Sequence, residues 1–231
     1  MYLYLIIKIH EIMATKKIKT DKESIISMYM EYTLEHSKKP QSVYLFAKVN
    51  SITEADFYKE FGTLESIDKE IFALFFSKTI DLIEKDPAFA EYETKNKLLS
   101  FYFTFFEMLT INRSYVSMTL KEHKNMLKNL SQLAILRKEF KKFITEIIDD
   151  NYLIKQEKVQ EIQLKGLQES AWIQFLLTMK FWLEDDSAAF EKTDIYIEKS
   201  VKLSFELINI APIDSLIDFG KFLFKEKIQK M

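Results

Sequence analysis

The chain has 231 residues, of which 48% are hydrophobic and 29% are charged, so it can bury a sizeable core. Three glycines and three prolines are too few for a turn-rich β fold, and the composition predicts an all-α protein. A formal net charge of −2 excludes a general attraction to nucleic acid or anionic lipid. The absence of cysteine excludes disulfides and thiolate chemistry, and it agrees with a cytoplasmic protein.

Residues 1–20 form an arm ahead of the predicted helices. Its uncharged start, Met1–Ile7, is much shorter than the ~20 residues of a membrane-spanning helix, and it has neither the basic start nor the cleavage site of a signal peptide. Two interpretations stay open: the start is assigned too early and translation begins at Met13, or the arm packs on a partner. The arm also carries lysines that would either be solvated or contact DNA phosphates, namely Lys16, Lys17 and Lys19, with Lys22 behind them.

The sequence pattern of residues 21–66 predicts a unit of three helices. The first helix, Asp21–His36, has apolar residues at helical spacing. It ends before Pro40, because the residue that precedes a proline avoids helical backbone. Ser42 then caps a short second helix, whose inward residues are Phe46 and Ala47.

A tight turn follows the second helix at Asn50 and Ser51, since both residues tolerate non-helical backbone. Thr53 caps a third helix with Phe57 on its inner face, and we expect Gly62 to end that helix in the left-handed conformation. The spacing of the two short helices is typical of a helix-turn-helix, which offers its second helix to a DNA groove.

Residues 42–71 resemble the N-terminal signature of the TetR family of bacterial transcriptional regulators. The matching residues are Ser42-Val43, Phe46-Ala47, Val49-Asn50-Ser51-Ile52-Thr53, Phe57-Tyr58-Lys59-Glu60-Phe61 and Thr63-Leu64-Glu65. The resemblance implies a helix-turn-helix DNA-binding domain at 21–66 and a helical effector-binding and dimerisation domain at 67–231. It also implies DNA contacts from Ser42, Thr53, Glu54, Ala55, Tyr58 and Lys59.

Two residues depart from the family pattern. Ser51 stands where the family has a glycine in the turn, and Leu64 stands where it has a lysine that contacts phosphate. The three acidic residues of Thr53–Phe61 also outnumber its single base, Lys59. Because lysine and arginine supply most of the affinity for DNA, this acidic helix favours a weakened or lost DNA function.

The predicted domain at 67–231 is rich in aromatic and methionine side chains. Its uncharged stretch, Leu98–Phe106, is too short to span a membrane and is typical of a buried helix. Such side chains suit the lining of an apolar ligand site, and they equally suit a packed core. The candidate ligand-binding residues are Phe101, Tyr102, Phe105, Met118, Trp172, Phe175 and Met179.

Two long periodic helices are predicted at about 157–184 and 193–209. Without a partner they would expose a large apolar face, so we expect a homodimer through these helices. A last amphipathic helix, Ile213–Lys227, carries lysines at its end. It would either lie on a membrane surface as a peripheral contact or close its own domain.

The sequence contains no recognisable catalytic or metal-binding pattern. The three histidines lack metal-ligand spacing, and no glycine-rich loop is available to hold a phosphate. The adjacent acids Asp149-Asp150 and Asp185-Asp186 diverge on a helix, and we expect them to be solvated. We therefore expect neither an enzyme nor a metal or other cofactor.

Two functional hypotheses follow. The first is a homodimeric, TetR-like transcriptional regulator that binds a DNA operator and is controlled by a small hydrophobic ligand in its C-terminal domain. The alternative is a TetR-fold protein that has lost DNA binding and binds lipid or a membrane surface. The acidic third helix and Leu64 favour the alternative, whereas the signature at 42–71 favours the first.

Overall fold

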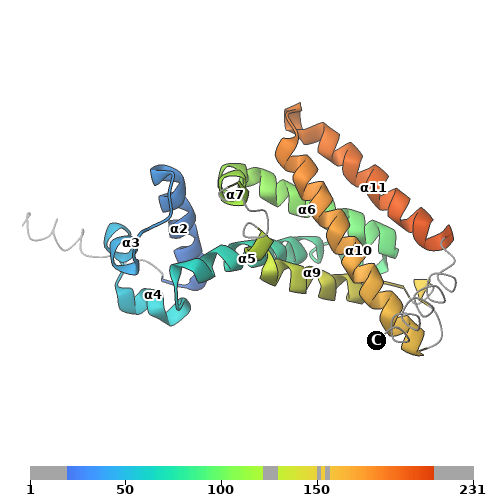
Figure 1. Ribbon diagram of the computed structural model, residues 1–231, viewed down its shortest axis with the longest axis horizontal. Coiled ribbons are helices and arrows are strands. Elements are labelled where there is room, and N and C mark those ends of the chain that lie inside the picture. The colour runs from blue at the N-terminus through green and yellow to red at the C-terminus, as the bar shows by residue number, and fades with distance from the viewer. Residues whose placement is uncertain (1–19, 122–129, 150–151, 154–156, 211–231) are drawn as a thin grey trace, which may run out of the picture. The chain divides into compact units, whose positions relative to one another are not determined.

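The computed structural model describes residues 20–121, 130–149, 152–153 and 157–210. Every regular element in these ranges is a helix, which confirms the predicted all-α fold (Figure 1). The N-terminal arm, the alternative start at Met13 and the predicted helix Ile213–Lys227 lie outside the described residues. No helix within the described ranges is both long enough and apolar enough to cross a bilayer.

The helices form two compact units. The first unit contains Met1–Leu74 and Asn112–Ile135, and the second contains Phe75–Ile111 and Leu136–Met231. This division groups a segment from the middle of the chain with the N-terminal helices. The domain boundaries expected from the sequence, at residues 20/21 and 66/67, stay a prediction.

The first unit is a small helical bundle with an aromatic interior. It is built from α2 (Lys22–His36), α3 (Val43–Val49), α4 (Glu54–Glu60), α7 (Arg113–Leu120) and the part of α5 (Leu64–Ile83) that reaches Leu74. Helix α4 packs on α3, and α7 packs on α2. The ring of Phe46 is fully buried between those of Tyr29 and Phe57, with centroid distances of 6.2 and 5.9 Å. These rings fix α2, α3 and α4 to one another.

Side-chain caps begin the short helices, as the sequence predicts. The Ser42 hydroxyl accepts a hydrogen bond from the Leu45 N–H at 3.1 Å, and the Thr53 hydroxyl accepts one from the Asp56 N–H at 3.0 Å. Each cap satisfies a backbone donor that the first turn of a helix leaves unpaired. The two caps therefore fix where α3 and α4 start.

The expectation for Gly62 is wrong. Helix α4 ends at Glu60, and Phe61 follows with extended backbone (φ −137°, ψ 136°) while its N–H still bonds to the Phe57 carbonyl. No glycine in the described part of the chain has a positive φ. The chain leaves the helix by straightening at Phe61, so no left-handed residue is needed at this end.

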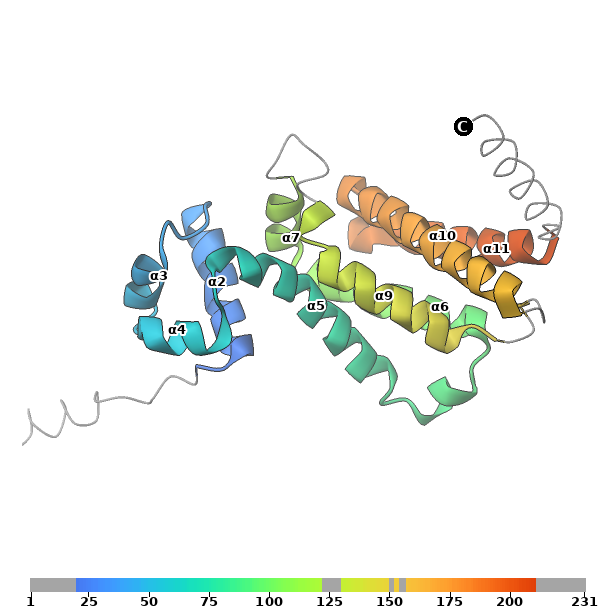
Figure 2. The ribbon, with the colours of Figure 1, turned by 60° about the horizontal axis from the view of Figure 1, so that its bottom comes forward.

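The second unit is a larger bundle around a cluster of aromatic rings. Its helices are the remainder of α5, α6 (Thr94–Ile111), α9 (Ala134–Ile147), α10 (Glu157–Glu184) and α11 (Glu191–Ile210), with short 3₁₀ segments at Pro87–Glu91 and Ala188–Phe190. Helix α11 packs against α6 and α10, and it runs antiparallel to α10 beside it (Figures 1 and 2). Phe101, Phe140 and Phe175 are fully buried at the centre of the cluster.

Candidate functional site

The turn between α3 and α4 is closed by a left-handed serine. Ser51 has φ 55°, its N–H bonds to the Lys48 carbonyl at 3.4 Å, and the Ile52 N–H bonds to the Ala47 carbonyl at 3.0 Å. This pair of bonds is the Schellman pattern that ends many helices, usually with glycine in the left-handed position. The turn therefore keeps its geometry although a serine replaces glycine.

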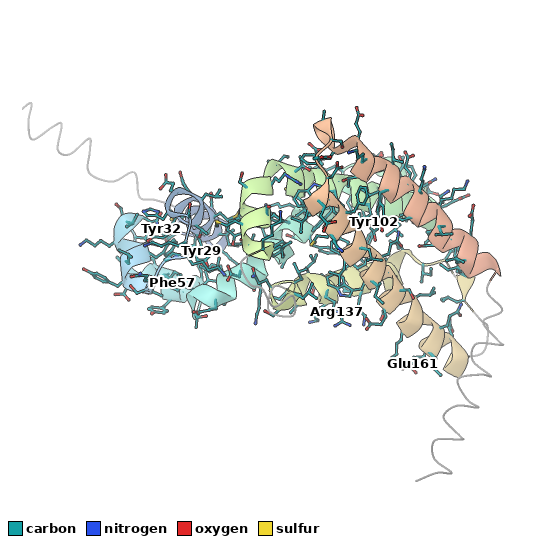
Figure 3. All side chains as sticks on the ribbon, turned by 45° about the horizontal axis from the view of Figure 1, so that its top comes forward. Tyr29, Tyr32, Phe57, Tyr102, Arg137 and Glu161 are labelled. Carbon is teal, nitrogen blue, oxygen red and sulfur yellow. The ribbon has the colours of Figure 1, made fainter. Side chains whose placement is uncertain are left out.

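The six residues expected to contact DNA all lie on the surface of this helix-turn-helix. Glu54, Ala55, Tyr58 and Lys59 share one side of α4, with Thr53 at its start, and all are exposed. Ser42 is exposed at the start of α3. The inner side of α4 is buried through Phe57 (Figure 3). The structure thus presents the expected contact residues to solvent.

The single base of α4, Lys59, is paired within the helix, whereas Glu54 and Glu60 leave its surface acidic. The Lys59 ammonium lies 2.7 Å from an Asp56 carboxylate oxygen, and the other oxygen of Asp56 accepts a hydrogen bond from the Thr53 hydroxyl. The hydrogen bond from Lys59, followed by that from Thr53, lowers the pKa of Asp56 to about 2. At neutral pH this carboxylate is ionised, and it competes with phosphate for the ammonium group of Lys59.

A buried carboxylate joins three helices of the first unit. Asp68, on α5, accepts hydrogen bonds from the Tyr29 hydroxyl at 3.1 Å and the Tyr115 hydroxyl at 3.4 Å, and its second oxygen lies 2.7 Å from the Lys39 ammonium. We name these four side chains the Asp68 cluster. Sequence reasoning missed it, and the available signal was an aspartate one position after Ile67 on the inner face of α5.

Six of the seven expected ligand-binding residues lie together in the second unit. Phe101, Tyr102, Phe105, Trp172, Phe175 and Met179 are all buried within the aromatic cluster. The seventh, Met118, lies on α7 in the first unit, where it lines a small cavity with Thr33 and Lys39. Met118 therefore belongs to a different unit from the other six.

The Tyr102 hydroxyl is an unusual feature of this cluster. It is fully buried and has no hydrogen-bond partner among the described residues (Figure 3). Burial, with a smaller contribution from Tyr196, raises the pKa of Tyr102 far above its ordinary value. The phenol is therefore neutral at physiological pH, and its O–H has no acceptor among the described residues.

An apolar cavity of the second unit lies beside the aromatic cluster and has a volume of about 320 Å³. Helices α6, α9, α10 and α11 supply its lining, which is mostly aliphatic and includes Leu98, Ile144, Ile147, Leu167, Phe205 and Ile208. Its described polar lining consists of Thr94, Ser170, Gln174 and Ser204. Such a volume and lining suit a small apolar molecule.

A second buried carboxylate connects α10 to α11. Asp185 accepts four hydrogen bonds: from the N–H and the hydroxyl of Ser187, at 2.9 and 2.6 Å, and from the N–H and the hydroxyl of Thr193, also at 2.9 and 2.6 Å. Burial raises the pKa of Asp185, but these bonds more than offset it and lower the pKa to about 2. The expectation of a solvated Asp185 is therefore wrong, whereas Asp186 is exposed.

Two helical units, with two short capped helices around a tight turn in one and an apolar cavity in the other, define the chain as an all-α protein of two parts. Residues 97–223 match the family model described as tetracyclin repressor-like, C-terminal domain. This match covers more than half of the chain, and the chain belongs to the TetR family. No curated protein matches it. Members of the family are regulators rather than enzymes.

Proposed function

We propose that this chain is a cytoplasmic, homodimeric transcriptional regulator that binds an operator through α3 and α4 and a small apolar effector in the second unit. The proposal rests on the exposed side of α4, which follows the hydrogen-bonded turn after α3. Residues 97–223 of the same chain match the TetR family. The six surface residues described above would make the DNA contacts.

A gel shift tests DNA binding directly. The probe is a duplex from beside the protein's own gene, titrated at 20, 100 and 300 mM salt. We expect binding that weakens with salt, because phosphate contacts release counterions. Tyr58→Ala should weaken binding about tenfold, since Tyr58 is exposed on α4, whereas Leu34→Ala on α2 should leave it unchanged. Absence of a shift at 20 mM salt would end the DNA-binding proposal.

The ion pair on α4 provides a second test of the same proposal. Asp56→Asn removes a negative charge and releases the Lys59 ammonium, so the affinity for DNA should rise by about threefold or more at low salt. Asp81→Asn makes the same charge change at an exposed position of α5 and serves as the control. Equal effects of the two substitutions would contradict a contact role for α4.

An exposed apolar stripe on α10 and α11 supports the homodimer. Six large aliphatic side chains are at least half exposed there: Ile162, Ile173, Leu177, Ile195, Leu203 and Leu207. A concentration of such side chains on two neighbouring helices is typical of an interaction surface. We infer that a second copy covers this stripe.

Sedimentation velocity tests this interface. Leu203→Asp places a charge in the stripe of both copies and should raise the dimer dissociation constant about 100-fold. Leu82→Asp is the matched control, because Leu82 is an exposed leucine of the second unit on α5. A dimer that tolerates Leu203→Asp as well as Leu82→Asp would exclude this interface.

The acidic side of α4 favours one alternative function, a TetR-fold protein that binds lipid or a membrane surface in place of DNA. Its membrane contact would come from residues 213–231, which lie outside the described residues. Flotation with anionic liposomes, with and without residues 213–231, distinguishes the two functions. Equal flotation of both forms, or of neither, would remove the membrane contact.

A further inference from the structure

We propose that the apolar cavity of the second unit selects an uncharged ligand that has an apolar part and one hydroxyl or carbonyl group, and that Gln174 binds this group. The inference rests on the proposed effector-binding function and adds the chemical class of the effector. It also assigns the polar contact to a residue outside the aromatic cluster.

The lining of the cavity carries no ionisable side chain among the residues that the structure describes. An ionised ligand would lose its hydration on entering and would find no opposite charge in that lining. Such an uncompensated burial of charge is strongly unfavourable. The lining therefore discriminates against carboxylates and ammonium groups of otherwise suitable shape.

The polar groups of the cavity differ in what they can still bind. The Thr94 hydroxyl is already engaged as donor and as acceptor: it donates to the Ile147 carbonyl at 2.8 Å and accepts from the Asp149 N–H at 3.2 Å. Ser170 is exposed, at the margin of the lining. This leaves the pair of Gln174 and Ser204 as the polar contact inside the cavity.

Gln174 is held in place by two serines of α11. Its amide nitrogen donates to the Ser200 hydroxyl at 3.3 Å, and its amide oxygen accepts from the Ser204 hydroxyl at 2.9 Å. A glutamine amide has two N–H donors and an oxygen with two lone pairs. After these two bonds, the described contacts leave one N–H and one lone pair for a ligand.

One remaining donor and one remaining acceptor match a neutral group. A ligand hydroxyl can both accept from the Gln174 N–H and donate to its oxygen, and a ligand carbonyl can accept from the N–H. A carboxylate would need several donors to compensate its buried charge, and it would meet a lone pair of the amide oxygen instead. The geometry of Gln174 thus favours the same class of ligand as the apolar lining.

Displacement of Nile red, an uncharged fluorescent probe, from the full-length protein tests the proposal. The competitors are 1-decanol and decanoate at pH 8, which share the chain length and differ in the charge of the polar group. We expect 1-decanol to displace the dye at a concentration at least about tenfold lower than decanoate, because only decanoate buries a charge. Equal potency of the two competitors would overturn the selectivity and leave effector binding intact.

Two substitutions separate the polar contact from the shape of the cavity. Gln174→Leu keeps the size of the side chain and removes its hydrogen bonds, and it should weaken 1-decanol about fivefold. Gln168→Leu on the same helix is the matched control, because Gln168 bonds to Thr145 and does not line the cavity. Equal effects of the two changes would exclude Gln174 as the contact.

A gain of function completes the test and does not depend on weakening the fold. Ser170→Lys adds a cation at an exposed residue of the lining and should improve decanoate about fivefold while 1-decanol is unchanged. Circular dichroism melting shows that each variant is folded. If neither Nile red nor any competitor binds the wild-type protein, the cavity is not an effector site, and both the proposed function of the second unit and the present inference fail.

Discussion

Each of the two units buries a carboxylate, and the two carboxylates differ in how far away in the sequence their hydrogen-bond partners lie. In the first unit Asp68 is satisfied by side chains 29 to 47 residues away in sequence, which come from α2, α7 and the segment before α3. In the second unit Asp185 is satisfied by Ser187 and Thr193, two and eight residues further along the chain. Asp68 therefore depends on tertiary packing, whereas Asp185 forms a local cap at the start of α11.

The difference predicts what each carboxylate controls. Separation of α5 from the other segments would leave the buried charge of Asp68 without its hydrogen-bond donors and without Lys39. Because this is costly, the Asp68 cluster opposes rearrangement of the first unit. Asp185 can keep its bonds while α10 and α11 move as a pair. We expect Asp68 to stabilise the packing of segments that are distant in sequence. We expect Asp185 to stabilise only the connection between α10 and α11.

The largest expected effect is that of Asp68→Asn, which removes the charge and leaves the ammonium of Lys39 partly buried without it. We expect a loss of about 3 kcal/mol from the protection of α2 and α7, measured by amide hydrogen exchange. Asp81→Asn on the same helix is exposed and should change protection by less than about 0.5 kcal/mol. Unchanged exchange in α7 would show that the Asp68 cluster does not tie this helix to α2.

Asp185→Asn should cost about 2 kcal/mol in urea unfolding at pH 7, with a marked pH dependence. The pKa of Asp185 is about 2 in the folded protein, below its ordinary value of 3.8. The contribution of the carboxylate is therefore complete above about pH 5 and is lost as the pH falls through the folded pKa. The difference between wild type and variant should shrink to about half by pH 3.

The neighbouring Asp186 provides the control for this titration. Its side chain is exposed and pairs with Lys192 at 2.8 Å, and an exposed pair contributes little to stability. Asp186→Asn should therefore leave the unfolding midpoint nearly unchanged at every pH. A pH-independent loss in Asp185→Asn would mean that shape rather than charge matters at this corner.

The smallest expected effect is a gain. Ser51→Gly relieves a left-handed serine and should stabilise α3 and α4 by about 0.5 to 1 kcal/mol. Ala55→Gly, on exposed helical backbone of α4, should destabilise the same region by a similar amount. If the two substitutions change the exchange protection of residues 43–60 in opposite directions, the strain at Ser51 is confirmed. Changes in the same direction would contradict it.

Local signals account for most of what could be predicted. Ser42 and Thr53 cap their helices because a hydroxyl reaches a backbone N–H three residues away, and this contact is independent of the rest of the fold. The same locality made the cap at Asp185 accessible from the sequence, through Ser187 and Thr193. It was missed because adjacent aspartates on a helix suggest solvated charge, whereas here α10 ends at Glu184, before both of them.

The prediction for Gly62 shows the limit of such signals. A glycine after a helix favours a left-handed end, but a chain can also leave the helix by extending, and Phe61 does so with its side chain buried in the core. Left-handed backbone occurs instead at non-glycine residues, among them Ser51, which the sequence marked only as a turn. The choice between these endings depends on where Phe61 can be buried.

The sequence by itself determined the helical class, the helix starts and the turn between α3 and α4, because apolar periodicity and capping act over only a few residues. Tertiary structure decided that Asp68 joins three helices, that Met118 belongs to the first unit and the other six candidates to the second, and that Gln174 faces a cavity. The contacts of Asp68 and the bond between Gln174 and Ser200 join residues at least 26 positions apart in the sequence. Only the packing of helices against one another brings such residues within a few ångströms.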